Sequence, residues 1–230
     1  AIPMPIPRPA NLGGGTAQAA SEAPRAVAIP TAPAAAPQVV PAAIETTPEA
    51  ALQRANAALN ALGQMQADFV QTSGNGRRAE GKIYLQKPGR VRFEYLPPAT
   101  LEIVADGSSV VIRDRKLGTQ DLYGIAQTPL KFLLRDKVDL SRDMRLLEIN
   151  PAPDLVSVTV EDKATFGGTS RIELFFDPRS YALKQWTVTD PQGYQTAVVL
   201  RNVDTRRAPD PANFFIDYTK SMPAAGGAFR

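Results

Sequence analysis

From about Met65 to Val203 the chain is a succession of short runs in which apolar and polar residues alternate. A period of two places successive side chains on opposite faces of a strand, so each run predicts a strand with one face toward a core. Turn signals such as Lys87-Pro88-Gly89, Pro97-Pro98 and Asp106-Gly107 separate the runs closely. The pattern therefore predicts a mainly β protein, built as an antiparallel meander.

About ten or eleven strands are expected. The runs cover residues 65–71, 81–86, 90–96, 100–105, 109–114, 119–123, 144–149, 155–162, 170–177, 183–190 and 195–203. Asp190-Pro191-Gln192-Gly193 is a hairpin turn between the last two runs. A sheet this wide curls, and its apolar concave face must be covered. The fold class is thus a curled antiparallel sheet with a cover supplied from elsewhere in the chain.

Two segments with helical signals can provide that cover. Thr47 can cap a helix that has Pro48 at its first position and ends near Gly63. Its apolar stripe consists of Ala51, Leu52, Ala55, Leu59 and Leu62. A second short helix is expected over Thr128 to Leu134, with a threonine cap and a proline in the first turn. The prediction is a helical lid on the concave face.

Composition divides the chain into three parts. Residues 1–47 are rich in proline and alanine and show no helical or strand period, so we expect a disordered or polyproline-like linker. Residues 48–220 are expected to form the folded domain, and residues 221–230 a flexible C-terminus. The linker could be a plain spacer or an arm that binds a partner. The first residue, Ala1, fits an exported chain after removal of a signal peptide.

The residue inventory argues against an enzyme. The chain has 0 His and 0 Cys, which removes the commonest general base and the usual soft metal ligands. No nucleotide-binding or nucleophile motif occurs, so no cofactor and no metal are expected. Glu94 with Glu102, and Glu161 with Asp162, are interpreted as solvent-facing charges rather than acid–base pairs.

A nucleic-acid partner is also not expected. The run from Arg90 to Tyr95 interleaves arginines with aromatic residues, but strand alternation places the two kinds on opposite faces. With 26 Lys and Arg against 23 Asp and Glu, the formal net charge is only +3. Charge therefore gives no support for phosphate-backbone binding.

An ordered series of motifs resembles the LolA family of outer-membrane lipoprotein carrier proteins. The resemblance covers the chain from about Ala51 to Lys220. Its motifs are F-x-Q at Phe69 and Gln71, G-x-I-x-L-x-K-P-G-R-x-R-F-E-Y from Gly81 to Tyr95, I-V-x-D-G from Ile103 to Gly107, V-V-I-R-D from Val110 to Asp114, and T-P-L-x-x-L-L from Thr128 to Leu134. Each motif is short, and their succession carries the resemblance.

The resemblance implies an unclosed β-barrel that shelters lipoprotein acyl chains under a helical lid. It implies a periplasmic shuttle from the inner to the outer membrane, loaded by a lipoprotein-releasing ABC transporter of the inner membrane. We expect the chain to be a monomer. An outer-membrane receptor is left open. The residues expected around the acyl chains are Val91, Phe93, Tyr95, Leu101, Ile103, Leu130, Leu133, Leu134 and Trp186.

Three alternatives stay open at this point. The same apolar residues could form a filled core with no cavity. The family's lid is held by an arginine at the position of Lys87, and a lysine offers a point charge in place of a planar fork of donors, so Lys87 is either a lid latch of another kind or only a charge in the turn. LolA-like folds also serve as lipid-binding sensor or regulatory domains of the cell envelope, which is the alternative function.

Overall fold

The computed structural model describes residues 46–220 and 222–223. The chain divides into two units, 1–43 and 44–230, and all described residues belong to the second. The predictions for the linker and for most of the C-terminus therefore lie outside the described residues. No helix among the described residues is both long and apolar enough to cross a membrane.

One sheet dominates the second unit. Its strands are β1 (Gln64–Ser73), β2 (Arg78–Gln86), β3 (Arg90–Tyr95), β4 (Leu101–Asp106), β5 (Ser109–Asp114), β6 (Thr119–Gly124), β7 (Arg145–Pro151), β8 (Val156–Thr165), β9 (Gly168–Phe176), β10 (Leu183–Thr189), β11 (Gln195–Asp204) and β12 (Met222–Pro223). The helices are α1 (Pro48–Ala61) and α2 (Lys131–Leu134), with 3-10 turns η1 (Ile125–Gln127), η2 (Pro211–Phe214) and η3 (Tyr218–Lys220).

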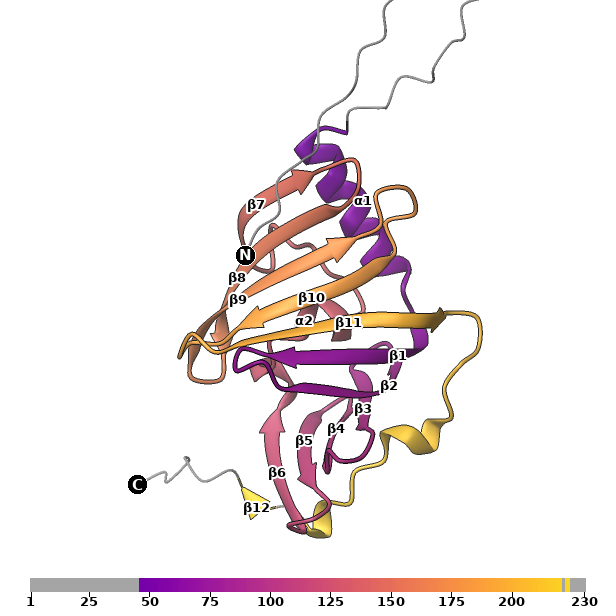
Figure 1. The fold of residues 1–230 in the computed structure, drawn as a ribbon, viewed down its shortest axis with the longest axis vertical. Coiled ribbons are helices and arrows are strands. Elements are labelled where there is room, and N and C mark those ends of the chain that lie inside the picture. The colour runs from indigo at the N-terminus through magenta and orange to yellow at the C-terminus, as the bar shows by residue number, and fades with distance from the viewer. Residues whose placement is uncertain (1–45, 221, 224–230) are drawn as a thin grey trace, which may run out of the picture. The chain divides into compact units, whose positions relative to one another are not determined.

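The strand order is β12-β6-β5-β4-β3-β2-β1-β11-β10-β9-β8-β7. Strands β1 to β11 pair antiparallel with their neighbours, and only the short β12 pairs parallel, with β6. Because β1 pairs with β11, the two halves of the chain meet in the middle of the sheet. No ladder joins β7 to β6 within the described residues, so the prediction of an unclosed antiparallel sheet is confirmed. Figure 1 shows the sheet curling around α2.

The concave face carries the main core. The strand alternation has the predicted sense, since Val91, Phe93 and Tyr95 are buried while Arg90 is exposed. Phe69 of β1 pairs with Gly81 of β2, and a Cβ added to Gly81 would come within 2.7 Å of the Phe69 ring. Glycine at position 81 therefore leaves room for the ring against the neighbouring strand.

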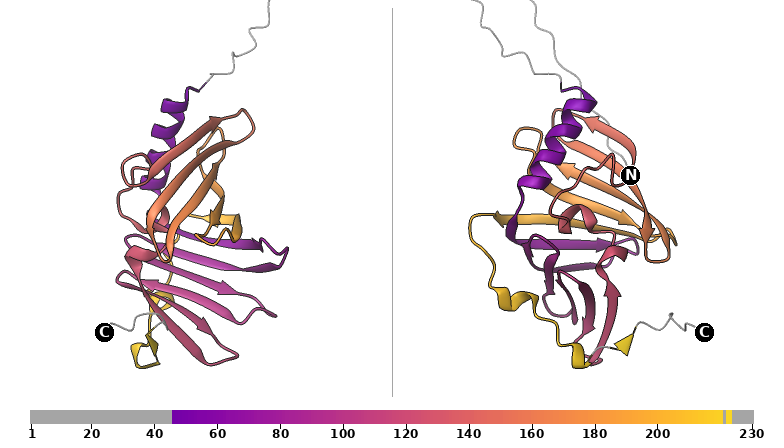
Figure 2. Two further views of the ribbon diagram at one scale, coloured as in Figure 1. Left: turned by 90° about the vertical axis from the view of Figure 1, so that its left-hand side faces the viewer. Right: turned by 180° about the vertical axis from the view of Figure 1, so that it is seen from behind.

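The helices agree with the sequence prediction in part. α1 begins as expected, with the Thr47 hydroxyl accepting a hydrogen bond from the Ala50 amide at 3.2 Å. Its buried residues are Ala51, Ala55 and Leu59, and Figure 2 shows from behind that the helix lies against the β7 to β10 part of the sheet. The second helix is shorter than predicted, because Thr128 is extended and α2 begins only at Lys131. Pro129 has no amide hydrogen to donate, and a single helical turn follows it.

The convex face contains a feature that the sequence analysis did not predict. The last predicted strand ends at residue 203 and no helical turn is predicted beyond it, yet after β11 the chain runs through η2 and η3. Ile216 of this segment packs with Val104 and Val111 in a second small core. Figures 1 and 2 show the segment passing beside the β3 to β6 half of the sheet.

This cover corrects the interpretation of Glu102. The sequence placed Glu102 on a solvent face, but the residue is 6% exposed. It forms ion pairs with Arg92 at 2.6 Å and with Arg113 at 3.6 Å. Arg113 also binds Gln120, whose amide donates to the Asp217 carbonyl at 2.9 Å. A polar network thus underlies the C-terminal segment.

Candidate ligand-binding site

The concave face holds a cavity of about 270 Å³. Its wall contains no charged side chain and is formed by Gln71, Val91, Phe93, Tyr95, Ile103, Val110, Ile112, Thr128, Pro129, Leu130, Leu134, Trp186, Val188, Thr196 and Val198. We call this space the central cavity. Two larger hollows, of about 620 and 820 Å³, include lysine or arginine side chains in their walls. An apolar ligand is therefore expected to prefer the central cavity.

Strand register explains how these residues meet. Phe93 pairs with Ile103, and Ile103 with Ile112, so one row of side chains crosses β3, β4 and β5 on the same face. On the other half of the sheet, Trp186 pairs with Val198. The curl turns these two rows toward each other, and the segment 128–134 lies over the space between them.

Seven of the nine residues predicted for the cavity lie in its wall. The other two, Leu101 and Leu133, lie outside it. Leu101 is 42% exposed at the start of β4. Leu133 belongs to α2, and its side chain is fully buried in the packed core. The wall residues not predicted are Gln71, Val110, Ile112, Thr128, Pro129, Val188, Thr196 and Val198. Extending the alternation of β5, β10 and β11 would have found most of them.

A cluster of aromatic rings forms the back of the central cavity. Phe93 contacts Phe69 edge-to-face at 5.4 Å between ring centroids, and Trp186 contacts Phe132 in the same manner at 5.9 Å. The Tyr95 hydroxyl donates to the Gln71 side-chain oxygen at 2.7 Å. Burial raises the pKa of Tyr95 to about 12, so its hydroxyl stays neutral near pH 7. The wall is therefore uncharged near pH 7.

The central cavity shares wall residues with two neighbouring hollows. A hollow of about 240 Å³ shares Val110, Ile112, Thr128 and Pro129 with it and extends to Phe166. The 820 Å³ hollow shares Gln71 and Tyr95 with it. The concave face is thus packed around Phe69, whereas Phe93 borders a cavity. The sequence alone could not distinguish a packed core from a cavity on this face.

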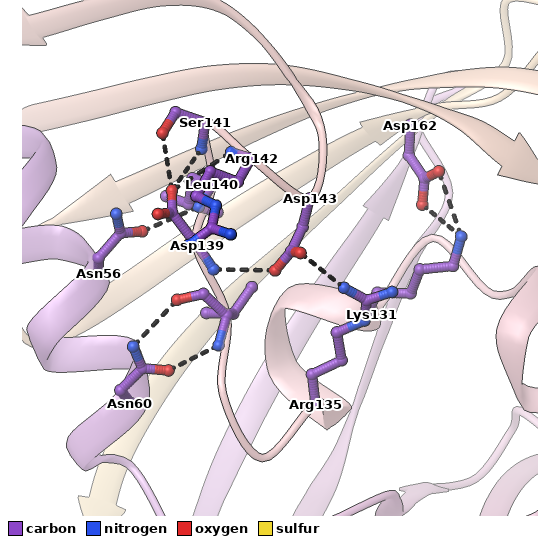
Figure 3. A network of polar contacts seen from close by, with 11 residues as sticks. Asn56, Asn60, Lys131, Arg135, Asp139, Leu140, Ser141, Arg142, Asp143 and Asp162 are labelled. Carbon is purple, nitrogen blue, oxygen red and sulfur yellow. Dashed lines mark hydrogen bonds and ion pairs between the residues drawn. The ribbon is translucent and has the colours of Figure 1, made fainter.

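Polar contacts hold the segment 128–134, which we call the lid, over the cavity (Figure 3). Lys131 forms an ion pair with Asp162 of β8 at 2.9 Å, and both side chains are largely buried. Asp162 is therefore not the solvent-facing charge that the sequence suggested. Arg135, just after α2, pairs with Asp143 at 2.9 Å.

Helix α1 fixes the chain that follows the lid. The Asn60 side chain accepts from the Val138 amide at 2.8 Å and donates to its carbonyl at 2.9 Å. The Asn56 side chain accepts from the Leu140 amide at 3.0 Å. Figure 3 shows both asparagines reaching from α1 to this loop. Asn60 thus bonds both backbone groups of Val138 as a neighbouring strand would, and the two side chains tie α1 to the loop that follows the lid.

The β2–β3 turn joins the two helices from the other side. The Lys87 ammonium group donates to the Leu59 carbonyl of α1 at 2.6 Å, while the Gly89 amide donates to the Leu134 carbonyl of α2 at 2.8 Å. The predicted latch residue thus contacts α1, and its neighbour in the turn contacts the lid. Burial lowers the pKa of Lys87 to about 8, against the opposing effect of Asp136.

Lys87 gives a pH-dependent contribution to stability. Its pKa is lower in the folded state than the ordinary 10.5, so the unfolded chain binds more protons between these values. The cost of burying the charge is present below pH 8 and is relieved as the pH rises toward 10.5. We expect the free energy of unfolding of the native chain, relative to Lys87→Met, to rise by about 1–2 kcal/mol from pH 7 to pH 10, allowing for partial exposure. Urea unfolding of both proteins at the two pH values measures this, and a constant difference would contradict it.

The site has the chemistry of a binding cavity. No group of three or more His, Cys, Asp or Glu side chains comes together among residues 46–220. The buried carboxylates Glu102 and Asp162 are each neutralised by an ion pair, and neither borders the central cavity. Fold and site together define a protein of the unclosed β-barrel class, with a lidded apolar cavity.

The comparisons with known proteins agree with this class. The family model described as outer membrane lipoprotein carrier protein LolA matches residues 60–217. The chain therefore belongs to the LolA family. An outer-membrane lipoprotein carrier protein of Chromobacterium violaceum is 29% identical over 170 residues, which cover 71% of this chain and 81% of the relative. A protein of the same name from Dechloromonas aromatica is 26% identical over 171 residues, covering 70% and 78%.

A solved structure with a similar course is the LolA superfamily protein NE2245 from Nitrosomonas europaea. It has a TM-score of 0.44 and 11% identity, and the match covers 75% of this chain and 99% of that chain. The relatives from Chromobacterium violaceum and Dechloromonas aromatica carry the name of carriers, and they do not favour the alternative of a sensor domain.

Proposed function

We propose that the chain carries lipoproteins across the periplasm with their acyl chains in the central cavity. The observation that carries the proposal is a charge-free cavity beneath a lid that is held by polar contacts at its margins. At about 270 Å³ the cavity itself lies close to the lower end of the ~300–1,000 Å³ range of ligand pockets, and a hollow of about 240 Å³ shares part of its wall. Relatives named outer-membrane lipoprotein carrier protein support the same proposal.

The energetics of acyl chains require such a cavity. Each methylene exposed to water costs about 0.8 kcal/mol, so a lipoprotein with several long chains does not leave its membrane unaided. A carrier offsets this cost by apolar contact, yet it must also release its cargo. A wall of aliphatic and aromatic side chains with few polar groups provides contact without strong directional bonds.

Trp186 provides a direct test of where acyl chains bind. It is the only tryptophan in the 230 residues, and its side chain lies in the cavity wall. We expect stearic acid brominated in mid-chain to quench the tryptophan emission of the delipidated protein saturably, because bromine quenches only on contact. Brominated acetate at the same concentration serves as the control. Stearate retained in equilibrium dialysis without quenching would place the chains outside this cavity.

The shuttling role needs an assay of its own. We infer that a lipoprotein-releasing ABC transporter of the inner membrane loads the chain and that the complex contains one copy of it. Inner-membrane vesicles that carry a labelled lipoprotein are expected to release it, with ATP, only when this chain is added. Gel filtration of the released product then gives its stoichiometry. Release that is equal without the chain would exclude the role.

A further inference from the structure

The few polar side chains of the central cavity gather at one end of it. The wall residues with a hydroxyl or an amide side chain are Gln71, Tyr95, Thr128 and Thr196, and Thr128 belongs to the lid. Thr196 pairs with Ser73, two residues along β1 from Gln71, so alternation places Thr196 and Gln71 on the same face. The Tyr95 hydroxyl reaches the Gln71 side-chain oxygen at 2.7 Å. We call Gln71, Tyr95 and Thr196 the polar end of the cavity.

The polar end has hydrogen-bonding capacity that the protein itself does not use. The Gln71 oxygen accepts from Tyr95, but the Gln71 amide nitrogen and the Thr196 hydroxyl have no hydrogen-bond partner within residues 46–220 and 222–223. Both side chains are partly buried in the cavity wall. An amide nitrogen and a hydroxyl can each donate to a carbonyl oxygen. The polar end therefore offers donors to a molecule bound in the cavity.

The polar end also lies where the cavity meets a hollow with charged walls. Gln71 and Tyr95 line both the central cavity and the 820 Å³ hollow. The wall of that hollow includes Arg77, Arg78 and Glu80. The 240 Å³ hollow shares other wall residues with the cavity, but it has no charged side chain, and the 620 Å³ hollow shares none. Within the described residues, a charged hollow thus adjoins the polar end of an uncharged cavity.

We propose that the polar end binds the carbonyl groups through which acyl chains are joined to a lipoprotein, with the chains in the central cavity and the polypeptide leaving through the 820 Å³ hollow. This rests on the proposed carrier function and adds a fixed orientation of the cargo. A carbonyl that enters an apolar cavity without a donor costs free energy, and the Gln71 amide and Thr196 hydroxyl remove that cost. The change from an uncharged wall to a charged one matches the change along the cargo from hydrocarbon to polypeptide.

Ester and ether lipids of equal chain length test the carbonyl contact. Dioctanoylglycerol has two ester carbonyls and 1,2-di-O-octylglycerol has none, while both carry the same free hydroxyl. Each is titrated against brominated stearate on the delipidated full chain, and recovery of Trp186 emission gives the affinity of both lipids on one signal. The measured quantity is the ratio of ester affinity to ether affinity, in which the contribution of the hydrocarbon chains largely cancels.

The variants are compared in a Tyr95→Phe background, because Gln71→Leu alone would leave the buried Tyr95 hydroxyl without its acceptor. Adding Gln71→Leu to this background should lower the ratio on the order of fivefold, through weaker ester binding. Thr196→Val keeps the shape of the side chain and should lower the ratio on the order of threefold in the native background. Gln195→Leu is the matched control, since Gln195 is exposed at the same end of β11, and it should leave the ratio unchanged.

A photoreactive cargo tests the orientation. A synthetic peptide with a diacylglyceryl cysteine at its N-terminus and benzoylphenylalanine as its second residue is bound to the native full chain and irradiated. Mass spectrometry is expected to find the cross-links in the wall of the 820 Å³ hollow, at residues such as Leu96 or Tyr194. Cross-links at Tyr123 or Phe166, in the wall of the 240 Å³ hollow, would overturn the orientation.

The ether lipid separates this proposal from the carrier function. It should displace brominated stearate from every variant, because its chains need only the apolar part of the wall. An ester-to-ether ratio that Gln71→Leu and Thr196→Val leave unchanged, with displacement intact, would overturn the carbonyl site while the cavity assignment stands. If neither lipid displaces brominated stearate from the native chain, the carrier function fails, and the carbonyl site fails with it.

Discussion

Replacing Phe93 with Glu is expected to weaken stearate binding by more than about a hundredfold, which corresponds to about 2.7 kcal/mol. Phe93 lies in the middle of β3 in the cavity wall, and its ring contacts Phe69 and Trp186. A carboxylate in its place would face the acyl chain, and an unpaired charge in an apolar site costs several kcal/mol unless it reaches water. An empty cavity can admit that water, but a bound acyl chain excludes it.

The same variant is expected to remain folded at 25 °C with a lower melting temperature. Losing the ring contacts costs about 3 kcal/mol, against a usual total stability of about 5–15 kcal/mol. In a fully packed core the carboxylate could not hydrate, and the loss would be larger. Because Phe93 borders the central cavity, the smaller loss of stability is expected here. A thermal melt beside the Trp186 quenching assay measures both effects on one sample.

Two controls accompany the measurement. Arg90→Glu places a carboxylate on the exposed face of the same strand and should change neither binding nor melting appreciably. Arg92 is not suitable for this purpose, because it forms the ion pair with Glu102. Phe93→Leu keeps the wall apolar and should bind stearate within about threefold of the native chain, less than 1 kcal/mol. A folded Phe93→Glu protein with native stearate binding would refute the cavity assignment.

Much of the fold could be predicted from sequence because its signals are local. Alternation placed Val91, Phe93 and Tyr95 on the buried face, and Asp190 to Gly193 formed the expected turn, with the Gly193 amide bonded to the Asp190 carbonyl at 2.9 Å. These features depend on neighbours in the chain. The register between β1 and β11 is a long-range pairing, which no local pattern specifies.

The cavity residues show where local signals stop. Leu101 and Ile103 share a face by alternation, yet only Ile103 lies in the cavity wall, because Leu101 starts its strand beyond the covered area. Leu133 belongs to the lid but points into packed core. Alternation identifies a face of a strand, whereas the position of a hollow depends on how far the sheet curls and on what the lid covers.

The buried charge of Glu102 is the feature least accessible to sequence, and its removal gives the second large effect. The carboxylate lies between Arg92 and Arg113 under the C-terminal segment. Replacing one partner of a buried ion pair leaves uncompensated charge and costs about 3–5 kcal/mol. We expect Glu102→Gln to lower the free energy of unfolding by about 3 kcal/mol, and the melting temperature by roughly 10 °C.

A matched control exists on the same sheet. Glu80 pairs with Arg78 at 2.7 Å, nearly the distance between Glu102 and Arg92, but both side chains are more than half exposed. Glu80→Gln should therefore cost no more than about 0.5 kcal/mol. Hydrogen exchange adds a local readout, because the Gln120 contact with Asp217 depends on Arg113 being held in place. Faster exchange from Ile216 to Tyr218 in Glu102→Gln alone would tie the ion pair to the C-terminal segment, whereas equal destabilisation by the two variants would show that burial adds nothing to this pair.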